Sequence, residues 1–283
     1  MEHRNRASGW WHAKVSGHKN EALIKELLDT DEKYASDFLK RIDCYYKTIK
    51  EISIGGLHET NVCSIVPDVR KTKSKTDLKL IYDDGSQTNI SIKKSLDGQV
   101  YLVRAGLFIE CFQRQFKKCI PENVVRAINL FWAAADDAVN IIECYGDKTA
   151  TKDYDLQIRH KSLNSTTLSA YDRELYNALL QWFRENSYEL AFLSFASGAA
   201  REQSEWSEFV WYKNMLAEND VDEVFLIEKI CRESARVAAK ETYYGTSNGG
   251  TTIQLPFGFV QWHQDQLQFH HKFDKIRNLL IDG

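Results

Sequence analysis

The hydrophobic pattern of this 283-residue chain changes its period several times. Apolar residues at helical spacing predict one helix from about Asn20 and a second over residues 32–50. The helical pattern continues over 105–145, where Pro121 restarts it at a first-turn position. Two more stretches with this spacing predict long helices over residues 171–196 and 221–240.

Strict alternation of apolar and polar residues marks the remaining segments as strands. Residues 77–82 and 89–93 alternate on either side of the turn sequence at 83–86, which predicts a β-hairpin. Three short strands are expected over 251–255, 259–263 and 266–270, with a turn near Asp265, before a last helix over 275–281. These elements predict a mixed α/β fold with a small central sheet flanked by helices.

Composition narrows the class of protein. Hydrophobic residues make up 43% and charged residues 27%, as in soluble globular proteins, and the length allows one large domain or two small ones. No apolar run approaches the ~18 residues of a membrane span, and the N-terminus lacks the apolar segment of a secretory signal. The six cysteines are scattered without a C-x-x-C pair, which indicates buried thiols in a cytoplasmic protein.

The charge is unevenly distributed. A formal net charge of −3 argues weakly against a nucleic-acid partner, but binding depends on where the charges lie rather than on their sum. Residues 70–79 contain five cations against one acid, Asp77. This basic run predicts contacts with a phosphate backbone, through Lys73, Lys75 and the nearby Lys94.

The predicted hairpin carries the candidate chemistry. A turn centred on residues 84–85 places Asp77 opposite Ile92, and Ser91 and Lys93 flank Ile92 on one face of the return strand. A carboxylate at this place can hold a divalent metal while an ammonium orients an attacking water, as metal-assisted phosphodiester hydrolysis requires. A surface hairpin with a weak Asp–Lys ion pair has the same pattern, so the pattern alone leaves both interpretations open.

Three segments give the hairpin a family resemblance. Ser74-Lys-Thr-Asp77 and Asn89-Ile-Ser-Ile-Lys-Lys-Ser95 resemble the core of the PD-(D/E)XK nuclease superfamily, and within it the type II restriction endonucleases of the MspI and HinP type. Gly17-His-Lys-Asn-Glu21 is similar to the first-helix signature of the same enzymes. The third segment is the C-terminal strand described below.

The resemblance implies roles for individual residues. Asp77 matches the metal-binding aspartate and Lys93 the catalytic lysine, with Glu21 as the supporting acid of the first helix. Ser91 stands where most of the superfamily has Glu or Asp, and the MspI and HinP types also lack an acid there. The resemblance therefore implies that Mg²⁺ is held by Asp77, the Ile92 carbonyl, waters and a DNA phosphate, with Ser91 as part of the catalytic set.

The C-terminal strand is the candidate for base recognition. Gln266, Gln268 and His270 share one face, and glutamine can pair bidentately with adenine in the major groove. A solvated edge strand has the same composition. However, Leu267-Gln-Phe-His270 resembles the (Met/Leu)-Gln-Phe-Lys strand with which MspI- and HinP-type enzymes recognise bases, with His270 in place of the lysine. Further candidate DNA contacts lie near the turn and beyond the catalytic strand: His263, Ser95 and Gln99.

Taken together, the residues and the resemblance predict a Mg²⁺-dependent type II restriction endonuclease that cleaves duplex DNA at a short palindromic site. We expect a single domain over 1–283, with a PD-(D/E)XK nuclease core (1–120), a mostly helical insertion (121–245) and a β-rich DNA-recognition tail ending in a β-hairpin (246–283). A cognate DNA methyltransferase is expected genetically, not as a bound partner, and no membrane is involved. A strand-nicking or repair nuclease of the same superfamily, or a sequence-specific DNA-binding protein with a decayed nuclease site, remain alternatives.

Overall fold

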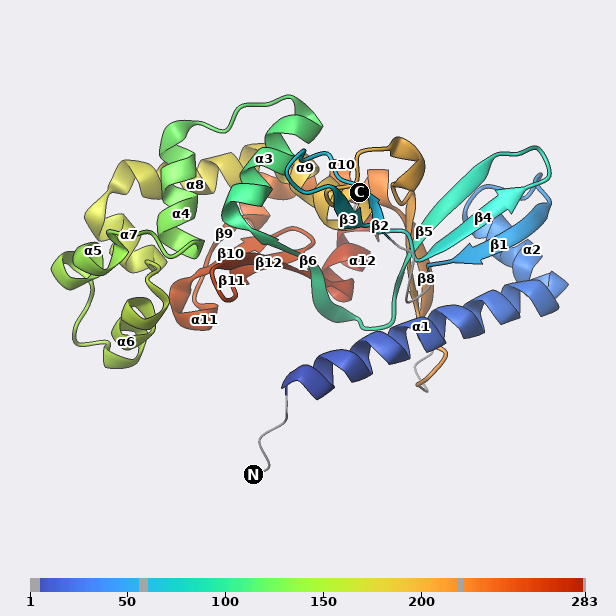
Figure 1. Ribbon diagram of the computed structural model, residues 1–283, viewed down its shortest axis with the longest axis horizontal. Helices are drawn as coiled ribbons and strands as arrows, with labels where there is room; N and C mark the ends of the chain where they lie inside the picture. The colour runs from blue at the N-terminus through green and yellow to red at the C-terminus, as the bar shows by residue number, and fades with distance from the viewer. Residues whose placement is uncertain (1–5, 56–60, 218–220, 282–283) are drawn as a thin grey trace. The chain divides into compact units, whose positions relative to one another are not determined.

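The chain has a mixed α/β fold and divides into two compact units, each assembled from separate stretches of sequence (Figure 1). The computed structural model describes residues 6–55, 61–217 and 221–281, with side chains from Val15 onward except those of 247 and 248. The first unit comprises Met1–Ser64, Arg70–Leu96 and Phe195–Glu228, and the second comprises Ile65–Val69, Asp97–Ser194 and Lys229–Gly283. The division into ranges 1–120, 121–245 and 246–283 stays a prediction.

A five-stranded mixed sheet forms the centre of the first unit, in the order β1-β4-β5-β7-β8. The strands β5 and β7 are parallel, and the other neighbours are antiparallel. Two helices and a separate two-stranded ribbon, β2-β3, accompany the sheet. The bounds are α1 (Arg6–Thr30), α2 (Glu32–Arg41), β1 (Ile49–Ile54), β2 (Asn61–Cys63), β3 (Lys71–Lys73), β4 (Leu78–Tyr82), β5 (Gln87–Lys93), β7 (Phe209–Lys213) and β8 (Asp222–Leu226).

The core of this unit lies between the two helices and the sheet. Ile24 of α1 and Phe38 of α2 are buried in one cluster with Leu78 and Ile90 of the sheet. Each fully buried side chain of this kind contributes roughly 1.5–3 kcal/mol. The apolar side chains of α1 and β4 therefore pack in one core, which fixes the helix against the strand that follows Asp77.

The predicted hairpin is confirmed as β4 and β5, but its register differs by one residue from the prediction. Leu78 pairs with Ile90, which places Asp77 level with Ser91 instead of Ile92. The cause is the loop: Tyr82 N donates to Ser86 O (2.9 Å), so three residues turn the chain, and Gly85 takes the positive φ of 79° that such a loop requires.

Two predicted helices are wrong in extent, because some of the residues assigned to them form the edge strands of the first sheet. The helix predicted over 32–50 ends at Arg41, and Ile49 already belongs to β1, which pairs with β4. The helix predicted over 221–240 begins only at Ile227, because its first residues form β8 along the edge of β7. Of the six cysteines, only Cys111 and Cys231 are buried, so the expectation of buried thiols fails for the others.

Asp222 joins α2, β7 and β8 in the first unit. Its carboxylate accepts hydrogen bonds from four donors: Tyr34 OH (2.5 Å), Arg41 Nη2 (2.8 Å), Trp211 Nε1 (2.8 Å) and Lys213 Nζ (2.7 Å). Burial alone would raise the pKa of Asp222, but the four donors outweigh burial and hold the pKa of this carboxyl well below its usual range. The ionised side chain is therefore part of the native packing.

The second unit is built on an antiparallel sheet with the order β6-β12-β11-β10-β9. The three strands predicted near the C-terminus are confirmed as β10, β11 and β12, and the final helix as α12. The strand β6, which was not predicted, lies beside β12. The bounds are β6 (Asp97–Arg104), β9 (Tyr243–Gly245), β10 (Thr252–Leu255), β11 (Gly258–Trp262), β12 (Gln266–Lys272) and α12 (Phe273–Ile281).

Helices account for most of the remaining sequence of the second unit. The predicted stretch 105–145 contains three helices, and Pro121 immediately precedes the second of them. The stretch 171–196 is not one helix, because the Asp172 side chain caps a new helix by accepting from the backbone of Glu174 and Leu175. The bounds are α3 (Ala105–Phe116), α4 (Glu122–Trp132), α5 (Ala138–Tyr145), α6 (Thr151–His160), α7 (Ser165–Tyr171), α8 (Arg173–Glu185), α9 (Ser187–Phe192), α10 (Ile227–Glu241) and α11 (Ser247–Gly250).

Within the described residues, no helix combines the length and the apolar character needed to cross a lipid bilayer.

Candidate active site

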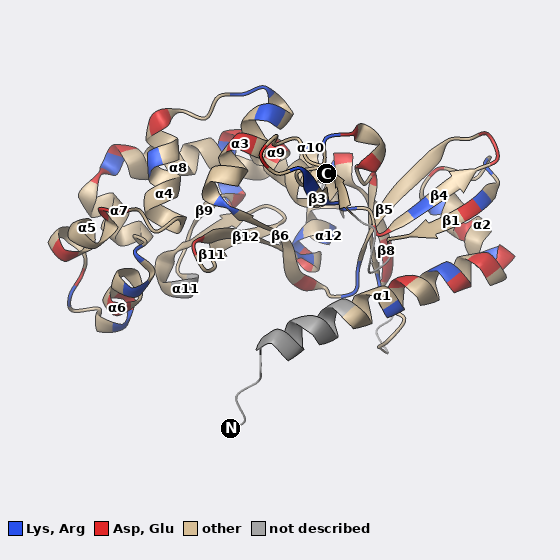
Figure 2. Cartoon of the chain, in the orientation of Figure 1, with Lys and Arg blue, Asp and Glu red and all other residues tan. Residues whose placement is uncertain are grey.

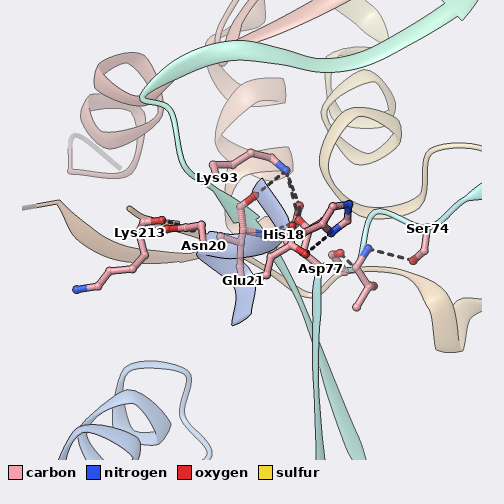
Figure 3. A network of polar contacts seen from close by, with 11 residues as sticks. His18, Asn20, Glu21, Ser74, Asp77, Lys93 and Lys213 are labelled. Atoms are coloured by element: carbon pink, nitrogen blue, oxygen red, sulfur yellow. Dashed lines mark hydrogen bonds and ion pairs between the residues drawn. The ribbon is translucent and has the colours of Figure 1, made fainter. Parts of the chain in front are cut away.

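The first unit brings four predicted site residues together: Glu21, Asp77, Ser91 and Lys93 (Figure 3). Glu21 is supplied by α1, Asp77 immediately precedes β4, and the other two are on β5. Ser91 and Lys93 alternate with Ile92 along the strand, so they share a face. The hairpin register places this face level with Asp77.

Asp77, Ser91 and Lys93 form a continuous chain of polar contacts. Ser91 Oγ donates to Asp77 Oδ2 (3.1 Å) and accepts from Lys93 Nζ (2.6 Å). Ile92 N also donates to Asp77 Oδ2 (2.7 Å), and Lys93 Nζ lies 3.8 Å from the same oxygen. Ser91 has an exposed fraction of 0%, so its hydroxyl is a fixed link between a carboxylate and an ammonium.

The backbone around Asp77 is anchored on both sides. Asp77 N donates to Ile90 O (2.9 Å), and its own carbonyl accepts from Gly55 N (3.0 Å). Just upstream, the hydroxyls of Ser74 and Thr76 both donate to the Glu205 carbonyl (3.1 Å each). The residues before Asp77 are thus tied to the segment that leads into β7, which limits movement of the carboxylate.

Glu21 is positioned by its neighbours on α1. Asn20 is 1% exposed; its side chain donates to Lys213 O (2.9 Å) and accepts from Met215 N (2.6 Å), which fixes the helix to the end of β7. One turn earlier, His18 Nδ1 lies 3.1 Å from Glu21 Oε2. No role was predicted for Asn20 or His18, although both lie within the Gly17–Glu21 segment that carried the resemblance.

The electrostatics of the four residues are dominated by the two acids. Burial is the main cause that raises the pKa of Glu21, the nearby charge of Asp77 adds to it, the Lys93 ammonium opposes it, and the net pKa is about 8. The ionised form of Glu21 is therefore disfavoured at neutral pH. A divalent cation bound beside Glu21 would stabilise its ionised form.

The donor set suits a hard cation such as Mg²⁺. Available oxygen ligands are the carboxylates of Asp77 and Glu21 and the carbonyl of Ile92, which lies 3.4 Å from Lys93 Nζ. Mg²⁺ takes one or two carboxylates and keeps waters or substrate phosphates in its remaining positions. Among the described residues there is no group of three or more His, Cys, Asp or Glu side chains arranged to hold a metal. The residues present therefore fit a Mg²⁺ ion that draws most of its ligands from water and substrate.

The residues predicted to contact the DNA backbone differ in how exposed they are. Lys73 is exposed at the end of β3, next to a second exposed lysine, Lys71 (Figure 2). Lys75 is half-buried, and its side chain packs against Gly198. Lys94 is half-buried and donates to Ser16 Oγ of α1. Ser95, which follows β5, is exposed. Lys73 and Ser95 are thus exposed, whereas Lys75 and Lys94 are half-buried.

The predicted base-contact residues lie in the second unit, on one face of its sheet. Gln268 Nε2 donates to Gln99 Oε1 (2.7 Å), and Gln261 Nε2 donates to Gln268 Oε1 (3.0 Å). This amide ladder, Gln99–Gln268–Gln261, crosses β6, β12 and β11. Gln268 is only 8% exposed, whereas Gln99 is exposed and Gln261 half-buried. The ladder fixes all three amides in place.

His270 extends the same face. Its ring is stacked on Phe259 with centroids 4.5 Å apart, and its Nε2 lies 3.4 Å from Gln261 Nε2. Burial lowers the pKa of His270, and the nearby His263 lowers it further. Both effects favour the neutral form of the ring. Gln266 starts β12, paired with Arg104 of β6.

His263 belongs to the tight turn that joins β11 to β12. Its backbone exchanges hydrogen bonds with Gln266, and the two residues between them, Gln264 and Asp265, both have positive φ. This is the geometry of a two-residue hairpin turn, near the predicted position at Asp265. The turn sets the register that pairs Gln261 with Gln268. Gln261 was missed as a candidate, although the alternation of Phe259, Gln261 and His263 within the predicted strand contained the signal.

Comparison with known proteins gives a distant likeness among solved structures. No protein-family model and no curated protein matches the chain. Among solved structures, the chain is similar to the restriction endonuclease MspI in complex with its cognate DNA, with 10% sequence identity over 87% of this chain and 81% of that chain and a TM-score of 0.41. At this level of identity and superposition, the function of the chain has to be argued from its own side chains.

Proposed function

We propose that the chain is a Mg²⁺-dependent nuclease of the PD-(D/E)XK type that hydrolyses phosphodiester bonds in duplex DNA at a short palindromic site, as type II restriction endonucleases do. The observation that carries the proposal is the contact chain Asp77–Ser91–Lys93, in which a carboxylate and an ammonium lie 3.8 Å apart and share a buried hydroxyl. The oxygen-only donor set and the nearby Glu21 support it.

Asp77 and the Ile92 carbonyl are the proposed Mg²⁺ ligands, with Glu21 as the supporting acid. When bound, Mg²⁺ supplies Lewis-acid stabilisation of the negative charge that develops on the phosphate oxygens. Ser91 Oγ and Ile92 N both donate to Asp77 Oδ2, so the carboxylate is fixed in place. Neither of these two hydrogen bonds uses the other carboxylate oxygen.

Lys93 is the proposed catalytic lysine. Its Nζ is held by Ser91 Oγ (2.6 Å) and the Ile92 carbonyl (3.4 Å), and its side chain is 18% exposed. An ammonium in this position can orient the attacking water and stabilise the added charge while the water oxygen bonds to phosphorus and one ester P–O bond breaks. Because Ser91 accepts from Lys93, the serine positions the ammonium as well as the carboxylate.

Two further features support DNA as the substrate. The exposed Lys71 and Lys73 offer the point charges that bind phosphates irrespective of sequence. The amide ladder offers groups for base edges: Gln268 uses one donor and one acceptor within the ladder, so it retains one N–H and one lone pair, the two that adenine requires.

Cleavage of supercoiled plasmid DNA tests the proposal. With Mg²⁺ the wild-type chain should give double-strand cuts at fixed places, and chelation by EDTA should abolish them. Asp77→Asn and Lys93→Met should each reduce cleavage by orders of magnitude, since each removes a group acting on the transition state. Asp68→Asn and Lys50→Met are matched controls, because both residues are exposed and lie outside the contact chain.

The same assay distinguishes the alternatives. Nicked circles without linear product would indicate a strand-nicking or repair nuclease with the same site. Sequence-dependent DNA binding in Ca²⁺ or Mg²⁺ with no cleavage would indicate a DNA-binding protein with a decayed site. Near-normal cleavage by the Asp77→Asn chain would overturn the assignment of the metal site.

A further inference from the structure

The second unit contains a cavity of about 490 Å³ between α10 and α12, away from all residues assigned above to DNA. The two helices run side by side in opposite directions, since Lys229 near the start of α10 contacts Leu280 at the end of α12. Buried Pro256 and Leu279 form the floor of the cavity. The volume lies within the range of roughly 300–1,000 Å³ that is typical of small-molecule sites.

Three cations from the two helices line this cavity: Arg236, Lys240 and Lys275. The lining contains one carboxylate, Glu241, which lies 3.8 Å from Lys240 Nζ. The formal charge of the lining is therefore positive even though the whole chain is acidic. A cavity with this lining attracts anions.

Lys275 is the most constrained of the three cations. Its Nζ donates to the Leu255 carbonyl (3.1 Å) and lies 3.5 Å from Gln254 Oε1. Both acceptors are neutral, so neither balances the ammonium charge. Burial lowers the pKa of Lys275, the nearby Glu241 opposes that effect, and Lys272 adds to it. An ammonium in this situation gains more from an anionic partner than a solvated one does, because its own hydration is already reduced.

Arg236 lies at the rim of the same cavity. Its Nε donates to Glu233 (2.5 Å), a contact that does not use the two terminal amino groups of the guanidinium. A guanidinium binds two phosphate oxygens at once, whereas a lysine acts as a single point charge. Val237 adds an apolar wall, and Asn278 adds an exposed amide.

We propose that this cavity binds a phosphate monoester of mononucleotide size. The phosphate would lie between Arg236 and Lys275, with Lys240 at the rim, and the organic part would cover Val237, Pro256 and Leu279. Asn278 and Glu241 offer hydrogen bonds to hydroxyl or amino groups of the ligand. The inference is independent of the proposed nuclease activity, because all of the lining lies in the second unit and Asp77, Ser91 and Lys93 lie in the first.

Isothermal titration of the full chain with AMP tests the proposal. We expect a dissociation constant below about 1 mM, with weaker binding of inorganic phosphate and of adenosine, since each offers only half of the contacts. Arg236→Gln and Lys275→Gln should each weaken AMP binding about tenfold or more. Arg236 is exposed, so its variant tests the site even if Lys275→Gln disturbs the fold. Exposed Arg159→Gln and Lys148→Gln are the matched charge controls, outside the cavity lining.

The outcomes separate this site from the proposed nuclease site. AMP binding that survives in Asp77→Asn and Lys93→Met but falls in Arg236→Gln supports the cavity. AMP binding that is lost in Asp77→Asn, or that is unchanged in both cavity variants, overturns it. No binding of AMP, together with binding of random duplex DNA that falls in Arg236→Gln, would show that the lining contacts diester phosphates, which also overturns the proposal.

Discussion

Replacing Ser91 with alanine removes a single oxygen atom that contacts both charged residues of the proposed site. In the native chain this oxygen donates to Asp77 Oδ2 at 3.1 Å and accepts from Lys93 Nζ at 2.6 Å. The side chain is fully buried, and alanine is smaller by one atom only, so the strand should keep its packing. The substitution therefore tests the positioning of the two charges without removing either of them.

The expected loss of cleavage rate follows from the hydrogen bonds that remain in the Ser91→Ala chain. Asp77 Oδ2 keeps its shorter hydrogen bond from Ile92 N (2.7 Å), so the carboxylate should stay in place. Lys93 Nζ keeps only the longer contact with the Ile92 carbonyl, 3.4 Å. A hydrogen bond to a charged group contributes about 1.5–3 kcal/mol. If that amount is lost from the transition state, cleavage slows roughly 10- to 150-fold, less than for removal of Lys93 itself.

Single-turnover cleavage in saturating Mg²⁺ measures this effect. The matched control is Ser194→Ala in the second unit, a buried serine whose hydroxyl has no hydrogen-bond partner among the described residues. The control should cleave at the wild-type rate. A Ser91→Ala chain that also cleaves at the wild-type rate would refute the argument, because Lys93 would then be positioned by something other than the serine.

Three further predictions concern other parts of the chain. Asp222→Asn should lower the free energy of unfolding by about 1–3 kcal/mol at pH 7. Because the pKa of Asp222 is depressed in the folded state, its contribution to the free energy of unfolding is complete above the unfolded pKa of about 3.9 and is lost as the pH falls toward the folded pKa. The free energies of unfolding of wild type and variant, measured by urea denaturation, should therefore converge as the pH falls below 4. Replacing Lys73 and Lys75 with alanine should weaken binding to every DNA sequence and flatten the salt dependence by about one unit for each lost phosphate contact; an unchanged slope would show that this run is a solvated surface. Gln268→Ala should reduce the difference in binding free energy between cognate and random DNA by about 1–3 kcal/mol. Because the pKa of His270 is lowered, raising the pH from 7 to 8 should leave this difference unchanged in the wild type.

The local chemistry of the site was accessible from sequence, because it depends on a hairpin with strong turn signals. Alternation over 77–82 and 89–93 was sufficient to bring Asp77 near Ser91 and Lys93. The register was displaced by one residue because loop length decides it, and Gly85 permits a three-residue loop that periodicity does not distinguish from a two-residue one.

The pairing of strands that are far apart in the sequence could not be predicted in the same way. The parallel partner of β5 is β7 (Phe209–Lys213), which has a buried apolar centre and no alternation, and nothing in its local sequence identifies β5 as its neighbour. For a related reason β8 and the first two residues of β1 fell within predicted helices: their spacing suits a helix, but they form the edge strands of the sheet. Likewise, the ladder that joins Gln261 to Gln268 depends on cross-strand contacts that a single strand does not reveal.

The order of the strands has a consequence for how the protein is made. The chain leaves the first unit at Leu96 and returns to it at Phe195, and Ser91 pairs with Val210 only after that return. A nascent polypeptide that has emerged as far as residue 194 already contains Asp77, Ser91 and Lys93, but it lacks β7, the parallel neighbour of β5. Pairings of such long sequence separation form late, because the intervening chain must first be closed into a loop. Synthesis thus separates the appearance of the charged side chains from the completion of the sheet that holds them, and we expect hydrolytic competence only in chains translated beyond β8.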